Sequence, residues 1–102
     1  MVLPDTLRYI GAEAFNGCYN AFKKIVIPES IKCIGSHAFR GCLLLEKAVF
    51  PSSIENIGSG IFDGCEKLSE ILVPKGCAKK YKEQLPFYAD KIIEMEEDIN
   101  EE

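Results

Sequence analysis

The chain has 102 residues, of which 47% are hydrophobic and 27% charged, and its formal net charge is −4. This length and composition predict one domain with a buried core and exclude a disordered segment. The negative charge and the scattered basic residues argue against nucleic acid as the main partner. We expect no membrane span, because no apolar stretch reaches about 18 residues, and no signal peptide in this chain.

One frame of nine residues occurs three times: "IGAEAFNGC" at 10–18, "IGSHAFRGC" at 34–42 and "IGSGIFDGC" at 57–65. Prolines stand at positions 4, 28, 51 and 74, with spacings of 24, 23 and 23 residues. These spacings define three units, at 4–27, 28–50 and 51–73. A sequence period of 20–50 residues indicates repeats that stack on one another.

Each unit ends in an apolar triplet before the next proline: "IVI" at 25–27, "AVF" at 48–50 and "ILV" at 71–73. Short β-branched runs that stop at proline predict strands, which stack in parallel. Side chains alternate along a strand, so the outer members of each triplet should face the core. The predicted core positions are Ile25, Ile27, Ala48, Phe50, Ile71 and Val73, together with Phe22, Leu45 and Leu68.

A second apolar pair in each unit predicts the other wall of the core, as a second short strand. In the second and third units these pairs are Ile31 with Ile34 and Ile54 with Ile57. The glycine that follows predicts a tight turn, for which we expect a positive φ. The "AF" segment is too short for more than one helical turn. Its phenylalanines, Phe15, Phe39 and Phe62, should cap the core.

Three cysteines, Cys18, Cys42 and Cys65, recur at the same position of the repeat. We interpret them as small buried hydrophobes in a structural ladder. Two alternatives stay open. Zinc ligands usually come in close pairs, which are missing here, and a disulfide needs converging Cβ atoms, whereas stacked residues have parallel ones. We therefore predict neither a metal nor a cofactor. Cys33 lies in a variable position, and Cys77 begins the end segment.

The only histidine, His37, occupies a variable position that holds Glu13 and Gly60 in the other copies. We interpret it as a solvated turn residue. A nucleophilic pair with Cys42 would need an exposed thiol with a lowered pKa, which a core position disfavours. The sequence also has no G-x-S-x-G or phosphate-binding glycine loop. We therefore predict that the protein is not an enzyme, and an enzyme is the remote alternative.

The end segment, 77–95, departs from the repeat. Residues 78–85 predict a helix between Gly76 and Pro86, with Ala78, Tyr81 and Leu85 on one face. Ile92 and Ile93 predict a last short strand or wedge. We interpret the segment as a C-terminal cap, and a partner-binding amphipathic helix is the alternative. The acidic residues 96–102 predict a disordered tail.

The repeat resembles the BspA-like leucine-rich repeat family, whose units resemble "IPxxVxxIGxxAFxxCxxLxxI". The resemblance covers residues 2–76, with Ile61 departing in the alanine position, and the end segment also looks like the one that closes such arrays. It implies an α/β repeat fold: a short right-handed solenoid at 1–76 with parallel strands and about three coils of 23 residues. The matching positions are Pro28, Ile31, Ile34, Gly35, Ala38, Phe39, Cys42, Leu45 and Ala48.

The resemblance also implies a function. Such proteins are mostly secreted or attached to the cell surface, so we expect a module that binds or adheres to host or bacterial proteins. We further expect the chain to be the C-terminal fragment of a longer bacterial protein, because no N-terminal cap precedes the first unit. The alternative is a purely structural spacer without its own ligand.

The middle triplet residues and the residues before the triplets should face outward. We predict an exposed, candidate partner-binding face made of Lys24, Val26, Lys47, Val49, Glu70 and Leu72. We also expect the first unit to expose an edge strand and apolar residues around Val2, Leu3 and Leu7. Because unpaired edges recruit other chains, this end should self-associate, whereas the cap should keep the other end out of the contact.

Overall fold

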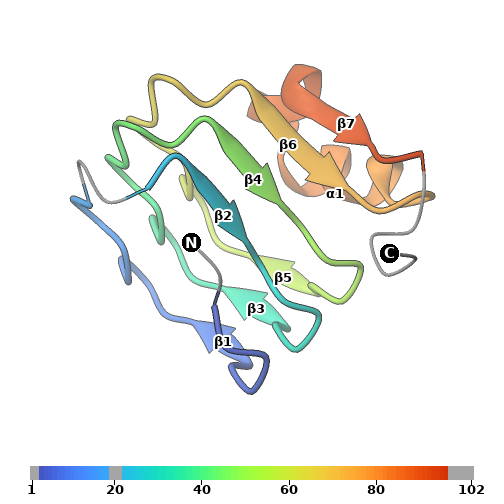
Figure 1. Cartoon of the computed structure of the whole chain (residues 1–102), viewed down its shortest axis with the longest axis horizontal. Coiled ribbons are helices and arrows are strands. Elements are labelled where there is room, and N and C mark those ends of the chain that lie inside the picture. The colour runs from blue at the N-terminus through green and yellow to red at the C-terminus, as the bar shows by residue number, and fades with distance from the viewer. Residues whose placement is uncertain (1–2, 19–21, 97–102) are drawn as a thin grey trace.

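A computed structural model describes residues 3–18 and 22–96 of the chain. Short strands alternate between two sheets, and helices follow near the C-terminus (Figure 1). In chain order the elements are β1 (Tyr9–Ile10), β2 (Lys24–Val26), β3 (Cys33–Ile34), β4 (Lys47–Val49), β5 (Asn56–Ile57), β6 (Glu70–Val73), helix α1 (Ala78–Gln84), the 3-10 helix η1 (Pro86–Lys91) and β7 (Ile92–Glu94).

Both sheets are parallel, and each unit contributes one strand to each. One sheet has the order β1-β3-β5, and the other has the order β2-β4-β6-β7. Strands therefore form at the predicted triplets and at the second apolar pairs, with boundaries that differ by one or two residues. The predicted parallel arrangement of the strands is confirmed.

The register equals the repeat spacing. Ile25 pairs with Ala48, and Ala48 pairs with Ile71. Hydrogen bonds between units continue outside the strands: the N–H of His37 donates to the Ser59 carbonyl at 2.9 Å. Backbone polar groups need partners, and here equivalent positions of neighbouring units supply them.

The core lies between the two sheets. All nine predicted triplet and leucine-position residues are buried, as are Ile31, Ile34 and Ile54. Ile57 is only half-buried, because no further strand covers β5 among the described residues. The prediction of a two-walled apolar core is therefore confirmed except at its last position.

The repeated phenylalanines form a column through the units. The Phe15 and Phe39 rings stack at 5.3 Å between centroids, and Phe39 and Phe62 stack at 5.8 Å. Phe39 and Phe62 are buried, whereas Phe15 is half-buried at the end of the column. Tyr88 of η1 closes the other end, edge-on to Phe62 at 5.7 Å.

The glycines of the Ile-Gly pairs do not have the expected positive φ. Close approach requires glycine at two of them: a Cβ on Gly35 would lie 2.4 Å from the Ala12 nitrogen, and one on Gly58 would lie 2.4 Å from the Ser36 nitrogen. Positive φ occurs instead two residues later, at Glu13, His37 and Gly60, and in the Gly-Cys pairs, at Gly17, Gly41 and Gly64.

The end segment forms the predicted helix and last strand. Tyr81 of α1 is buried, as is Leu85, which directly follows the helix, and the Tyr81 hydroxyl donates to the Pro51 carbonyl. β7 pairs with β6, so Ile92 lies beside Ile71. The segment thus continues one sheet, but it places helices where the other sheet would receive a fourth strand (Figure 1).

The first unit supplies an edge to both sheets, since β1 and β2 are outermost. The expected exposure of Leu3 is wrong: this side chain is buried in the core cluster, and Leu7 packs against it half-buried. Leu3 and Leu7 therefore pack onto the core and do not form an exposed apolar surface at this end. Val2 and residues 97–102 of the predicted tail lie outside the described residues, and self-association stays a prediction.

Replacement of Phe39 by alanine should lower the free energy of unfolding by about 3–5 kcal/mol, because the side chain is fully buried in the aromatic column. Phe15→Ala is the matched control: it has the same repeat position but is half-buried, and should cost clearly less. Urea unfolding measures both. Equal losses in the two variants would contradict the column as described.

Gly35→Ala should destabilise the chain by about 1–3 kcal/mol, because the new methyl group meets the backbone of the first unit. Gly11→Ala serves as the control, since nothing lies within 4 Å of a Cβ at that position. The control should change stability by less than about 1 kcal/mol. Thermal melts of both variants test this. A Gly35→Ala variant as stable as the wild type would refute the close approach.

Candidate partner-binding strand face

The outward side of the β2-β4-β6-β7 sheet carries two rows of side chains. The first row is charged and aligns Lys24, Lys47 and Glu70 in register. The second row is apolar, and it runs across four strands. We call this second row the apolar ladder, and its members are Val26, Val49, Leu72 and Ile93.

The predicted exposure of these residues holds in part. Lys24 is exposed, and Val26, Lys47, Glu70 and Leu72 are half-buried. The prediction for Val49 is wrong, because this side chain is only 5% exposed.

Val49 nevertheless stands apart from the core cluster, whereas its neighbours Ala48 and Phe50 belong to it. Val49 therefore faces outward but is covered from both sides, by Val26 and Leu72 on the adjacent strands. Alternation predicted the direction of the side chain. It could not predict the lateral cover, which depends on the size of the residues one repeat away.

The apolar ladder has a member that the sequence interpretation missed. Ile93 lies beside Leu72 in the register of β6 and β7 and is 43% exposed. The signal was present, since a last strand was predicted at Ile92 and Ile93. Burial of Ile92 requires, by alternation, that Ile93 faces outward.

Two members of the charged row, Lys47 and Glu70, form an ion pair between neighbouring strands. Lys47 Nζ lies 3.3 Å from Glu70 Oε1, with side chains 43% and 39% exposed. A pair this exposed contributes little to stability. It does keep both charges beside the apolar ladder.

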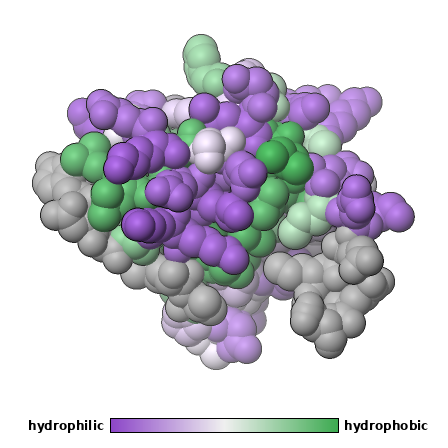
Figure 2. Space-filling model, turned by 45° about the horizontal axis from the view of Figure 1, so that its top comes forward, coloured by the Kyte–Doolittle hydropathy of each residue, from purple (hydrophilic) through white to green (hydrophobic). Residues whose placement is uncertain are grey.

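A shallow pocket of about 150 Å³ lies where β2 and β4 end. Val26 and Val49 of the apolar ladder line it together with Pro28, Glu29 and Pro51. The carboxylate of Glu29 accepts hydrogen bonds from the Ser52 hydroxyl at 3.0 Å and the Ser52 N–H at 3.2 Å. On the side of the molecule seen in Figure 2, apolar patches are likewise interrupted by hydrophilic residues.

The repeated cysteines form a hydrogen-bonded ladder. Cys65 Sγ donates to the Phe39 carbonyl at 3.0 Å, and Cys42 Sγ donates to the Phe15 carbonyl at 3.5 Å. Cys42 and Cys65 are buried and Cys18 is half-buried, and all three are free thiols, as are Cys33 and Cys77. These hydrogen bonds join the second and third units to the phenylalanine of the preceding unit. A side chain that served only as a buried hydrophobe would not make such bonds.

Burial raises the pKa of the Cys42 thiol to about 12 and also raises the pKa of Cys65. These thiols stay protonated at neutral pH, which does not suit a nucleophile. His37 is half-buried, and its Nε2 lies 3.7 Å from Asp63 Oδ2 in the next unit. The predicted turn residue thus has a specific neighbour.

Within residues 3–18 and 22–96, no group of three or more His, Cys, Asp or Glu side chains is placed to hold a metal ion. The helices in this part of the chain are too short and too polar to cross a membrane.

Comparison with known proteins identifies one family. Its model, described as "BspA type Leucine rich repeat region (6 copies)", matches residues 1–96. No curated protein and no solved structure matches the chain.

The raised thiol pKa values predict a loss of stability at alkaline pH. Unfolded cysteine has a pKa of about 8.5, so the contribution of Cys42 is complete below this pH. It is lost as the pH rises toward about 12. Urea unfolding of the wild type at pH 8 and pH 10.5 should show this loss, which for one thiol is at most about 1.4 kcal/mol per pH unit.

The Cys42→Ala variant should be less stable than the wild type at pH 8. Between pH 8 and pH 10.5, however, it should lose less stability than the wild type. Cys33→Ala is the control, because this thiol lies outside the ladder, and its loss should equal that of the wild type. Parallel losses in the wild type and in Cys42→Ala would contradict a role for the buried thiol.

Proposed function

The chain belongs to the BspA-type leucine-rich repeat family, and on this premise we propose that it is a non-catalytic protein-binding or adhesion module. The partner is a host or bacterial protein, and the strand face contacts it. Proteins of this family are typically surface or secreted repeat proteins, which supports a location at the cell surface or outside the cell.

We infer further that the two parallel sheets are opposite walls of a short right-handed solenoid of about three coils. The register supports this, because the strand pairs within the three units join residues one repeat apart. Residues 77–95 then act as its cap. Stacked repeats present extended surfaces that commonly serve in protein recognition.

The observation that carries the proposal is the apolar ladder. Four apolar side chains stand in register on the outward side of one sheet, and Ile93 at its end is 43% exposed. The charged row beside it holds the Lys47–Glu70 pair. An apolar centre beside a polar rim is the usual anatomy of a protein interface.

The side chains that could act as nucleophiles do not favour an enzyme. The Cys42 and Cys65 thiols are buried, have raised pKa values and donate hydrogen bonds to backbone carbonyls. The family is also generally non-catalytic.

The test is a pull-down from bacterial and host surface-protein extracts, quantified by mass spectrometry. The double variant Leu72→Ser/Ile93→Ser should lose retained proteins at least about tenfold, as expected when a central apolar contact is removed. Tyr9→Ser is the matched control, since Tyr9 is 63% exposed on the other sheet, and it should retain them. Circular dichroism verifies folding.

If the double variant retains the same proteins as the wild type, the strand face is not the binding surface. If the folded wild type retains nothing above background, the spacer alternative replaces the proposal.

A further inference from the structure

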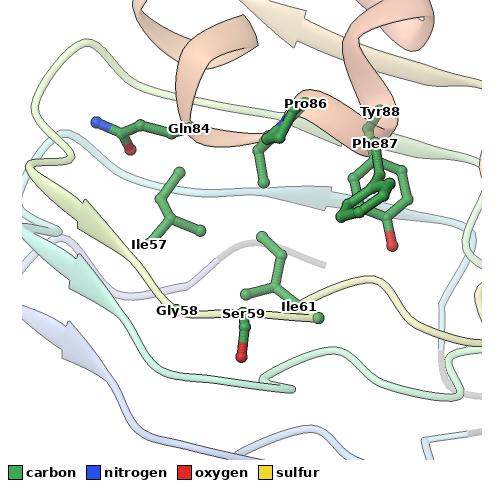
Figure 3. Close-up of a pocket in the computed structure, with 10 residues that line it drawn as sticks. Ile57, Gly58, Ser59, Ile61, Gln84, Pro86, Phe87 and Tyr88 are labelled. Atoms are coloured by element: carbon green, nitrogen blue, oxygen red, sulfur yellow. The ribbon is translucent and has the colours of Figure 1, made fainter.

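A groove separates the third unit from the cap, on the side of the molecule that carries β5 (Figure 3). Two adjoining pockets of about 320 and 420 Å³ form it, and both are lined by Gly60, Phe87 and Tyr88. Ile57 and Ile61 border it from the third unit, and Gln84 and Pro86 border it from the cap. The groove exists because helices take the place of a fourth strand beside β5.

Backbone donors point toward the next unit at three positions of the repeat. In the first unit these N–H groups bond to carbonyls of the second unit at 3.0, 2.7 and 3.0 Å, and in the second unit they bond to the third at 2.9, 2.9 and 2.7 Å. The first-unit donors are Glu13, Phe15 and Gly17, and the second-unit donors are His37, Phe39 and Gly41.

The equivalent donors of the third unit are the N–H groups of Gly60, Phe62 and Gly64. None of them has an acceptor within residues 3–18 and 22–96. The repeat therefore directs them toward the cap side, where Gly60 lines both pockets. In the other two units, main-chain carbonyls accept hydrogen bonds from the equivalent donors. The third-unit donors are therefore suited to bind main-chain carbonyls as well.

The side chains of the groove specify what else a ligand should carry. Phe87 is 91% exposed and offers an apolar surface. Asp63 contributes a carboxylate, which accepts a hydrogen bond from the Tyr88 hydroxyl at 3.4 Å. Gln84 Oε1 is buried without a partner, although its Nε2 donates to the Glu55 carbonyl at 3.4 Å. No lysine or arginine is among the described residues that line the two pockets.

We propose that this groove binds an extended, basic peptide segment of a partner protein. The peptide carbonyls accept hydrogen bonds from the N–H groups of Gly60 and Phe62. One apolar side chain of the peptide packs on Phe87, and a lysine or arginine of the peptide pairs with Asp63. An anionic ligand would face the Asp63 carboxylate, and no lysine or arginine among the described lining residues compensates that charge. A second copy of the chain does not fit, because the cap fills the space that a fourth unit would need. The addition of main chain to unpaired backbone groups is an established mode of peptide recognition.

The probe is the peptide acetyl-Lys-Val-Lys-Val-Lys-amide, titrated into the ¹⁵N-labelled full chain and followed by NMR. The amides of Gly60 and Phe62 should shift downfield as they acquire acceptors, while those of Val26 and Leu72 on the strand face stay in place. The peptide acetyl-Glu-Val-Glu-Val-Glu-amide is the control and should bind at least about tenfold more weakly. Equal binding of both peptides, or shifts confined to the strand face, would overturn the proposal.

Two substitutions in the full chain test the side-chain contacts. Phe87→Ala should weaken binding about tenfold. Because this side chain is 91% exposed, its removal should leave the fold intact. Asp63→Asn should weaken it about threefold at low salt and less at high salt, since exposed charges are screened. Ile93→Ala is the matched control on the strand face and should bind the peptide as the wild type does. Unchanged affinity in both Phe87→Ala and Asp63→Asn would refute the site, whatever the pull-down shows for the strand face.

Discussion

Backbone hydrogen bonds between neighbouring units are the interaction on which the rest of this structure depends. Within the three units each strand pairs with the strand one repeat away, and the turn between strands does the same, as with the N–H of Phe39 and the carbonyl of Ile61 at 2.9 Å. Every residue must therefore fit directly against its own counterpart. This constraint explains the column of phenylalanines, the cysteine ladder and the glycines at which two backbones nearly touch.

The sequence predicted what depends on one unit alone. Apolar alternation located the strands and the buried members of each triplet, and helix signals located α1 between Gly76 and Pro86. The incorrect predictions concern positions whose environment depends on other parts of the chain. Val49 is covered by Val26 and Leu72, and Gly35 is crowded by Ala12. Leu3 is buried because it folds back onto the core. None of these contacts is visible in the pattern of a single unit.

The two candidate sites differ in how far the sequence could predict them. Alternation identified the outward direction of the strand-face side chains, but the prediction omitted Ile93 and missed the burial of Val49. The groove arises where the repeat stops. There donors such as the Gly60 N–H, which have no acceptor in the part of the chain that the structure describes, lie beside the exposed Phe87 of η1. The donors follow from the repeat once its hydrogen bonds are known. Their position opposite the cap follows only from the way η1 packs against the third unit, through Tyr88 and Phe62.

The direction of the bonds between units also has a mechanical consequence. A force that separates the first unit from β7 acts along these bonds and loads one interface at a time, because each unit contacts only its neighbours. Such a load should peel the domain unit by unit at low force, unlike a fold whose terminal strands resist by shear. The cysteine ladder and the aromatic column cross the same interfaces. They would set the size of each step in an extension trace.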